Sequence, residues 1–156
     1  MSYLFLDTSA LLKLYLSELG STWLQSFAQS RRVVVSELAF YESATAIRRR
    51  YAEGAFTQAE AYTLYVRIRR DRHLYEVVGM GGELQLDRLI AITFNLPPNM
   101  RLRALDGIHL TAAELALDFA NNLIPPEPFV FVSSDRQLLQ VAQVRGFIIE
   151  NPEDHP

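Results

Sequence analysis

The sequence predicts an α/β domain with a mainly parallel central sheet and helices on both faces. Three observations support this fold class: short apolar runs recur along the chain, amphipathic stretches separate most of them, and glycines or prolines mark several boundaries. The apolar runs lie at residues 3–6, 33–35, 75–78, 129–132 and 147–150. Strands that alternate with helices at this spacing usually pair in parallel, because each crossover helix packs back onto the sheet.

The first half of the chain contains four expected helices, at residues 10–15, 21–29, 37–52 and 57–72. Gly20 separates the first two. Ser36 follows the second apolar run and is a favourable N-cap for the third helix, which Gly54 ends. Thr57 and Glu60 have the spacing of a capping box, so the fourth helix is expected to begin at Thr57.

The second half contains three further expected helices, at residues 83–94, 106–120 and 135–144. Pro97 and Pro98 force a loop before the second of them, because the residue before a proline disfavours helical backbone. Gly146 ends the third. The glycines at 79–82 are expected to form a turn, since Leu84 stands where a dinucleotide-binding loop needs its third glycine.

Length and composition predict one domain. A chain of 156 residues that is 49% hydrophobic can bury one sizeable core but is short for two domains. We expect this domain over residues 1–150, followed by a frayed C-terminal tail over 151–156. No apolar run approaches the roughly 20 residues of a membrane span, and no signal peptide is apparent, so we expect a cytoplasmic protein. Without cysteine, any metal ion must be held by oxygen or imidazole.

Two aspartates follow apolar runs at the points where strands are expected to give way to helices. Asp7 ends the first run, and Asp135 follows the fourth after two serines. Either aspartate could simply cap its helix, although Ser134 and Gln137 already offer a capping box beside Asp135. Because ligands of parallel sheets gather at the carboxyl ends of the strands, the two acids also indicate a shared pocket.

Two further acids lie on expected helices. Glu42 lies opposite the apolar stripe of its helix, on a mixed strip with Leu38, Thr45 and Arg49 that is typical of a helix bordering a cleft. An ordinary exposed glutamate fits nearly as well. Asp106 is expected to open a helix, and His109 lies one turn later. The histidine could orient Asp106, bind substrate or carry a proton, but a plain packing role is the commoner one.

Positive charge is concentrated in one part of the chain. The net charge is −3, yet residues 31–75 hold nine arginines against five acids. Arg48, Arg49 and Arg50 belong to this stretch and are candidates for contacts with phosphates or with an acidic partner. A solvated helix face is the alternative interpretation.

Four segments resemble, in order, the acidic motifs of PIN-domain ribonucleases, particularly the VapC-like toxins of type II toxin-antitoxin pairs. They read FLDTSALL, SELAFYESATAIRRR, RLRALDGIHLTAA and FVSSDRQLLQVA, and the resemblance extends from Tyr3 to Glu150. It implies a single PIN-like domain with endoribonuclease activity towards RNA phosphodiester bonds. It also implies a cytoplasmic and often dimeric protein that a cognate antitoxin neutralises, with Arg48–Arg50 as candidate contacts to RNA or antitoxin.

The resemblance also implies the site residues. Asp7, Glu42, Asp106 and Asp135 match the acids that bind Mg²⁺, or Mn²⁺ as a substitute, and Ser9 and Ser133 match accompanying hydroxyl positions. The residue types agree with this chemistry, because hard divalent cations prefer oxygen ligands. Our hypothesis is that the first three acids hold the principal ion while Asp135 supports a second ion or positions water. The long connection from Asn121 to Pro128 departs from the shortest family members.

Other functions remain open at this level. A PIN-like binding module without catalysis would keep the same fold and partners, and a stand-alone RNA-processing nuclease would need no antitoxin. Two phosphoryl-transfer classes are disfavoured by missing residues. A haloacid-dehalogenase-like phosphatase needs an acid where Ser9 stands, and a receiver domain needs a late lysine, whereas Lys13 is the single lysine.

Overall fold

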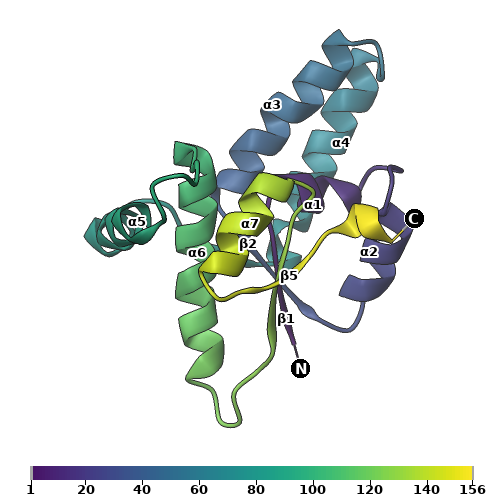
Figure 1. Ribbon diagram of the computed structural model, residues 1–156. Helices are drawn as coiled ribbons and strands as arrows, with labels where there is room; N and C mark the ends of the chain where they lie inside the picture. Colours follow the sequence, from purple (N-terminus) through teal and green to yellow (C-terminus); the bar gives the residue numbers. More distant parts are fainter. Residues whose placement is uncertain (1, 156) are drawn as a thin grey trace.

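A computed structural model describes residues 2–155, and its centre is a five-stranded sheet (Figure 1). The strands are β1 (Tyr3–Leu6), β2 (Arg32–Ser36), β3 (Glu76–Val78), β4 (Phe129–Val132) and β5 (Ile148–Glu150). Their order is β3-β2-β1-β4-β5, and every neighbouring pair is parallel. The predicted parallel sheet is therefore confirmed.

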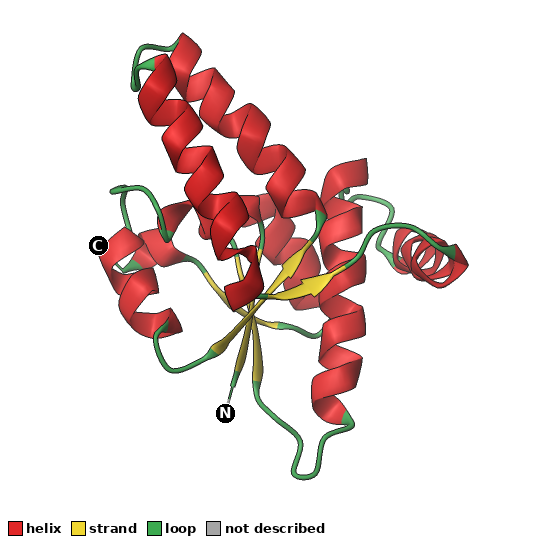
Figure 2. Cartoon of the chain, turned by 180° about the vertical axis from the view of Figure 1, so that it is seen from behind, coloured by secondary structure: helices red, strands yellow, loops and turns green. Residues whose placement is uncertain are grey.

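Helices cover both faces of this sheet (Figure 2). They are α1 (Thr8–Lys13), α2 (Ser21–Ala28), α3 (Leu38–Ala52), α4 (Gln58–Arg70), α5 (Glu83–Asn95), α6 (Ala104–Asn121) and α7 (Arg136–Val144), with short 3-10 helices η1 (Asp71–Leu74) and η2 (Pro152–Asp154). No helix within residues 2–155 is long and apolar enough to cross a membrane.

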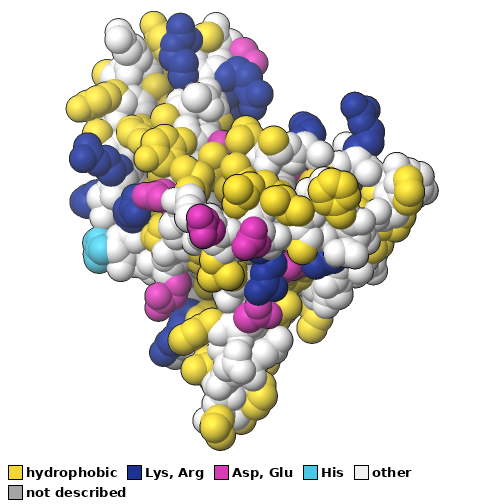
Figure 3. Space-filling model, turned by 90° about the vertical axis from the view of Figure 1, so that its left-hand side faces the viewer, with side chains coloured by type: hydrophobic (Ala, Val, Ile, Leu, Met, Phe, Trp, Pro, Cys, Tyr) yellow, Lys and Arg dark blue, Asp and Glu magenta, His cyan; other side chains and the backbone are white. Residues whose placement is uncertain are grey.

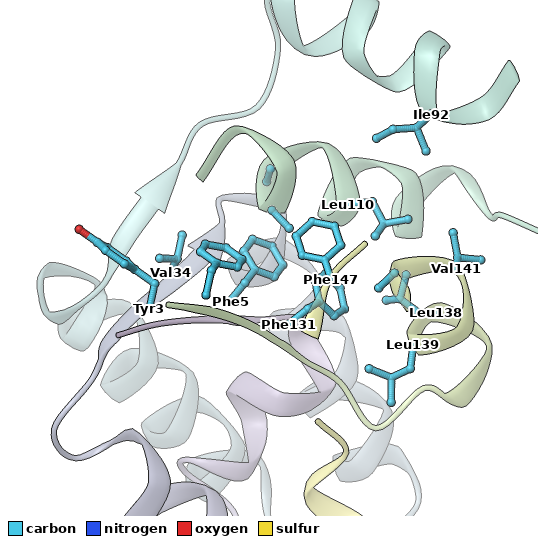
Figure 4. Packing of buried hydrophobic residues seen from close by; sticks show 14 of the residues in the cluster. Tyr3, Phe5, Val34, Ile92, Leu110, Phe131, Leu138, Leu139, Val141 and Phe147 are labelled. Atoms are coloured by element: carbon cyan, nitrogen blue, oxygen red, sulfur yellow. The ribbon is translucent and has the colours of Figure 1, made fainter. Parts of the chain in front are cut away.

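Alternating side chains of β1 build two hydrophobic cores, one on each face of the sheet. Tyr3 and Phe5 join the core beneath α6 and α7, where Phe5 stacks on Phe131 with ring centroids 5.2 Å apart (Figure 4). Leu4 and Leu6 point into the second core, which is formed with α1 to α4. The central strand is thus apolar throughout because both of its faces are buried.

The order in which the chain adds strands to the sheet switches sides between β1 and β4, although all strands run parallel. From β1 the chain continues to β2 and β3 on one side, and it later forms β4 and β5 on the other. Leu6 and Val132 are register partners at the ends of β1 and β4, so the residues that follow them leave the sheet side by side. Such a switch point opens a crevice at the carboxyl edge of the sheet.

Two helix starts differ from expectation by two residues, and the other starts agree to within one residue. The first helix begins at Thr8, two residues earlier than predicted, because Asp7 accepts the backbone N–H of Ala10 and caps it. The sixth begins at Ala104 rather than Asp106, with Arg103 in extended backbone as its N-cap. Asp106 consequently lies in the first turn of α6 instead of opening it.

The C-terminal segment is ordered, so the prediction of a frayed tail is wrong for residues 151–155. Asn151 is 5% exposed, and its side chain caps η2 by accepting the N–H of Glu153. Buried Lys13 donates to Glu153 at 3.1 Å, and His155 stacks on Trp23 with ring centroids 4.0 Å apart. These contacts attach the segment to α1 and α2.

Candidate active site

Asp7 lies buried at the carboxyl end of β1, with both carboxylate oxygens engaged. Oδ1 accepts the Ala10 N–H at 2.9 Å and the Ser9 hydroxyl at 2.7 Å, while Oδ2 accepts the Ser133 hydroxyl at 2.7 Å. Burial raises the pKa of Asp7 above its ordinary value, although positive charge on His109 and these hydrogen bonds act in the opposite direction. A buried carboxylate of this kind is stabilised by a cation.

Two serines tie the ends of β1 and β4 together. The Ser133 hydroxyl donates to Asp7 and accepts the backbone N–H of Asp135 at 2.9 Å. The Ser9 hydroxyl likewise donates to Asp7 and accepts the N–H of Ser134 at 2.9 Å. The hydroxyl groups of Ser9 and Ser133, both expected at the site, therefore fix the first and last acidic motifs relative to each other.

Glu42 points from α3 towards α1 and α6. Its Oε1 accepts the Thr8 hydroxyl at 2.6 Å and lies 2.5 Å from Nε2 of His109. Partial burial acts to raise the pKa of Glu42, but the hydrogen bonds from His109 and Thr8 outweigh it and leave the pKa below its ordinary value. Glu42 is therefore an ionised carboxylate at neutral pH.

His109 contacts Glu42 rather than Asp106, so of the roles that the sequence left open, orienting Asp106 is excluded. The imidazole is 2% exposed, packs edge-on against Phe5, and leaves Nδ1 without a hydrogen-bond partner among the described residues. Since an ionised carboxylate only accepts hydrogen bonds, Nε2 carries the proton. His109 fixes the direction of the Glu42 side chain.

A single arginine bridges the other two acids. Arg103 donates through Nε to Asp106 Oδ2 at 2.8 Å and through Nη2 to Asp135 Oδ2 at 2.6 Å. Its side chain is 70% exposed, compared with 20% for Asp106 and 30% for Asp135. Hydrogen bonding and charge from Asp106, with further charge from Asp135, raise the pKa of Arg103.

Asp135 itself caps α7, contrary to the expectation that Ser134 and Gln137 supply the capping box. Oδ1 of Asp135 accepts the backbone N–H groups of Gln137 at 2.9 Å and Leu138 at 3.2 Å. The Ser134 hydroxyl is buried and has no partner within residues 2–155. The cap moves to Asp135 because Ser9 and Ser133 hold the preceding backbone in place.

All four predicted acids line one cavity of about 560 Å³ at the carboxyl edge of the sheet. Its lining also includes Thr8, Ser9, Leu12, Thr45, Ala46, Arg49, Arg50, Arg103 and His109. Of the predicted strip, Glu42, Thr45 and Arg49 border this cavity, whereas Leu38 is buried and is not part of its lining. Arg48 is absent from its lining and instead lies over the ring of Tyr51.

The donor set suits a hard divalent cation, because carboxylate and hydroxyl oxygens dominate the cavity wall. Within residues 2–155, however, no three acidic or histidine side chains converge as a ready-made metal cluster. Each of the four acids instead has its own partners, which are Arg103 for Asp106 and Asp135, hydroxyl and backbone donors for Asp7, and Thr8 and His109 for Glu42. Mg²⁺ needs only one or two carboxylates when it retains water, so the residues fit it without full convergence.

Sequence reasoning missed Arg103 and Thr8. Thr8 directly follows Asp7, and Arg103 lies one helical turn before Asp106, so their spacing was a usable signal. The direction of each side chain was not, because Thr8 reaches Glu42 on another helix and Arg103 reaches Asp135 across the cavity.

Comparison with solved structures identifies proteins of the same fold. A chain of the DNA-bound VapBC from Salmonella typhimurium superposes with a TM-score of 0.64 at 13% identity, covering 97% of this chain and 99% of that one. PAE2754 from Pyrobaculum aerophilum gives 0.61 at 19% identity, with 99% and 85% covered. VapBC2 from Rickettsia felis, bound to a promoter DNA fragment, gives 0.61 at 12% identity, with 96% and 98% covered.

Sequence comparison adds no assignment, because no protein-family model matches the chain and no curated protein shows significant similarity. The structural likeness spans nearly the whole chain at identities below 20%, and at that level it concerns the fold. The chain therefore has the PIN-like fold that its four acidic motifs predict, the fold of the solved VapBC proteins and PAE2754.

Proposed function

We propose that the protein is a Mg²⁺- or Mn²⁺-dependent endoribonuclease and the toxin of a toxin-antitoxin pair. One observation carries the proposal: four carboxylates from four separate segments line a single cavity at the switch point of a parallel sheet. The VapBC structures of the same fold support the assignment to this class.

The chain's own residues divide the work of such a site. Asp7 forms its buried base, and Ser9 and Ser133 hold that carboxylate still. His109 aims Glu42 at the cavity. A divalent cation bound among these carboxylates would activate water for attack on a phosphodiester and offset the charge that develops on the phosphoryl oxygens.

Arginines on the cavity wall supply the counter-charge for RNA. Arg49 and Arg50 lie on α3 and line the cavity beside Glu42, and Arg50 pairs with Glu18. Figure 3 shows dark-blue side chains over the upper lobe, which Figure 1 identifies as the α3–α4 hairpin. An RNA backbone that reaches the carboxylates would pass this basic surface, where contacts with phosphates stabilise the complex.

The remaining partners belong to the same proposal. A cognate antitoxin is supported by the VapBC complexes, which share this fold. A homodimer is supported by an exposed apolar face on α5, formed by Leu84, Leu86, Ile90 and Phe94. The cytoplasmic location is a prediction from the sequence.

RNA cleavage with and without a divalent cation tests the proposal. We expect cleavage with Mg²⁺ or Mn²⁺, loss of cleavage in EDTA, and loss in Asp7→Asn and Asp106→Asn. Asp87→Asn is the matched control, because Asp87 is an exposed acid on α5 outside the cavity. Cleavage that persists in EDTA, or full activity in Asp106→Asn, contradicts the proposal.

A binding module without catalysis is the second candidate. The observation that favours it is the arginine bridge, since Arg103 already neutralises two of the acids. Calorimetric titration with Mn²⁺ separates the candidates. A nuclease should bind Mn²⁺ and lose that binding in Asp106→Asn, whereas a silent module should show no such binding.

A further inference from the structure

Asp135 has one carboxylate oxygen that does not cap α7, and both Arg103 and a bound cation would contact that oxygen. Oδ1 of Asp135 is committed to the cap of α7, where it accepts two backbone N–H groups. Oδ2 is the oxygen left to face the cavity, and Arg103 holds it at 2.6 Å. A cation that binds Asp135 without uncapping α7 therefore meets Oδ2, the oxygen that Arg103 already contacts, and the two positive charges compete there.

We propose that Arg103 is a built-in substitute for the metal ion, one that leaves Asp135 when a divalent cation binds and then contacts the RNA phosphate. This inference rests on the proposed nuclease function. In the metal-free protein, the guanidinium keeps two acids from repelling each other and leaves the fold intact without a cation.

The contacts of Arg103 make such a movement easy. Its side chain is 70% exposed, and within residues 2–155 its hydrogen bonds run only to Asp106 and Asp135. Exposed ion pairs of this kind are weak, because water competes for both partners. Arg103 also sits on extended backbone just before α6, so its side chain can swing without disturbing the helix.

Once released, the guanidinium stays beside the carboxylates that bind the cation. Arg103 lines the same cavity as Asp7 and Glu42. Its planar fork can donate two parallel hydrogen bonds to a phosphate, as it now donates to two carboxylates. The Arg103 side chain thereby neutralises the carboxylates in the metal-free protein and binds the RNA phosphate in the metal-bound protein.

Mn²⁺ affinity in the absence of RNA tests the exchange. We expect Arg103→Gln to bind Mn²⁺ more tightly than the wild type by on the order of three- to tenfold, because the competing cation is gone. Arg103→Lys should fall between the two, since one ammonium replaces the fork. Arg136→Gln is the matched control: Arg136 directly follows Asp135, is 68% exposed, and pairs with Asp154 instead.

Cleavage at saturating Mn²⁺ tests the second half. Although its metal site is filled, Arg103→Gln should show a kcat/KM reduced by on the order of ten- to a hundredfold. Equal or weaker Mn²⁺ binding in Arg103→Gln overturns the exchange, and wild-type cleavage in that variant overturns the phosphate contact. Both results leave the nuclease assignment intact, whereas Mn²⁺ binding by neither protein overturns that assignment as well.

Discussion

Adjacent serines at the end of β4 differ in what their hydroxyl groups contact. Ser133 is fully buried and hydrogen-bonds both the Asp7 carboxylate and the backbone N–H of Asp135. The Ser134 hydroxyl is buried with no partner in the described part of the chain. The first serine therefore links two motifs of the site through its hydroxyl, while the second contributes only its backbone N–H, which donates to Ser9.

This difference predicts unequal losses of stability for two conservative substitutions. Ser133→Ala should lower the free energy of unfolding by about 1–3 kcal/mol, because it leaves a buried carboxylate oxygen and a buried N–H without their partner. Ser134→Ala should change it by less than about 0.5 kcal/mol. Urea unfolding of the two variants provides the comparison, and equal losses would contradict the hydrogen-bond network.

Residue-scale prediction from the sequence succeeded where local periodicity carried the information. The helical wheel put Glu42 on a strip with Thr45 and Arg49, and all three line the cavity. It left the role of His109 open, with Asp106 as one of its possible partners. The imidazole lies on the Glu42 side of α6, because the packing of α3 against that helix decides which acid it meets.

At the scale of elements, the start of α2 and the C-terminal segment are fitted closely together. Gly20 caps α2 with φ of +80°, and a Cβ there would lie 2.1 Å from the carbonyl oxygen of Pro152. Gly54 has nearly the same φ, +82°, but nothing lies within 4 Å of its would-be Cβ. Comparing substitutions at the two glycines therefore separates the cost of left-handed backbone from the cost of close packing.

Alanine at these glycines should reveal the docking of the C-terminal segment. Gly54→Ala should cost roughly 1–2 kcal/mol of stability from left-handed backbone strain, and Gly20→Ala should cost more because Pro152 must also move. Trp23 is the single tryptophan and stacks on His155, so its fluorescence reports undocking. A changed spectrum is expected in Gly20→Ala alone, and equal stability losses would contradict the close contact.

The whole molecule presents an apolar face that its own fold does not cover. Helix α5 packs against α6 and carries Leu86 and Phe94 at 57% and 83% exposure. Figure 3 turns this side towards the viewer and shows hydrophobic side chains gathered across its middle. Contiguous exposed apolar clusters are typical of protein interfaces.

If two copies of the chain associate through this face, introducing a charged side chain there should reduce the mass of the particle in solution. Phe94→Glu should convert a dimer to a monomer at low micromolar concentration, because the interface would bury an unpaired carboxylate. Tyr62→Glu is the control, since Tyr62 is 71% exposed on α4. Light scattering after gel filtration measures the mass. A wild-type monomer, or a dimer that persists in Phe94→Glu, contradicts the interface.

The sequence by itself predicted the sheet and its helices, and the resemblance of four segments to a known family singled out the four acids. The strands and helices follow from signals within single segments, namely apolar runs buried on both faces of strands and helical periodicity. The frayed tail was the main error, because Asn151 to His155 are polar in composition yet pack against α1 and α2.

Only the tertiary structure decided how the acids are used. The contact between His109 and Glu42 joins residues 67 positions apart, and that between Ser133 and Asp7 spans 126 positions. Arg103 reaches Asp135 across 32 positions. Side-chain direction at such separations depends on how helices and strands pack, which local periodicity does not contain. The partners of each carboxylate, and the arginine that bridges two of them, therefore emerge only in the folded chain.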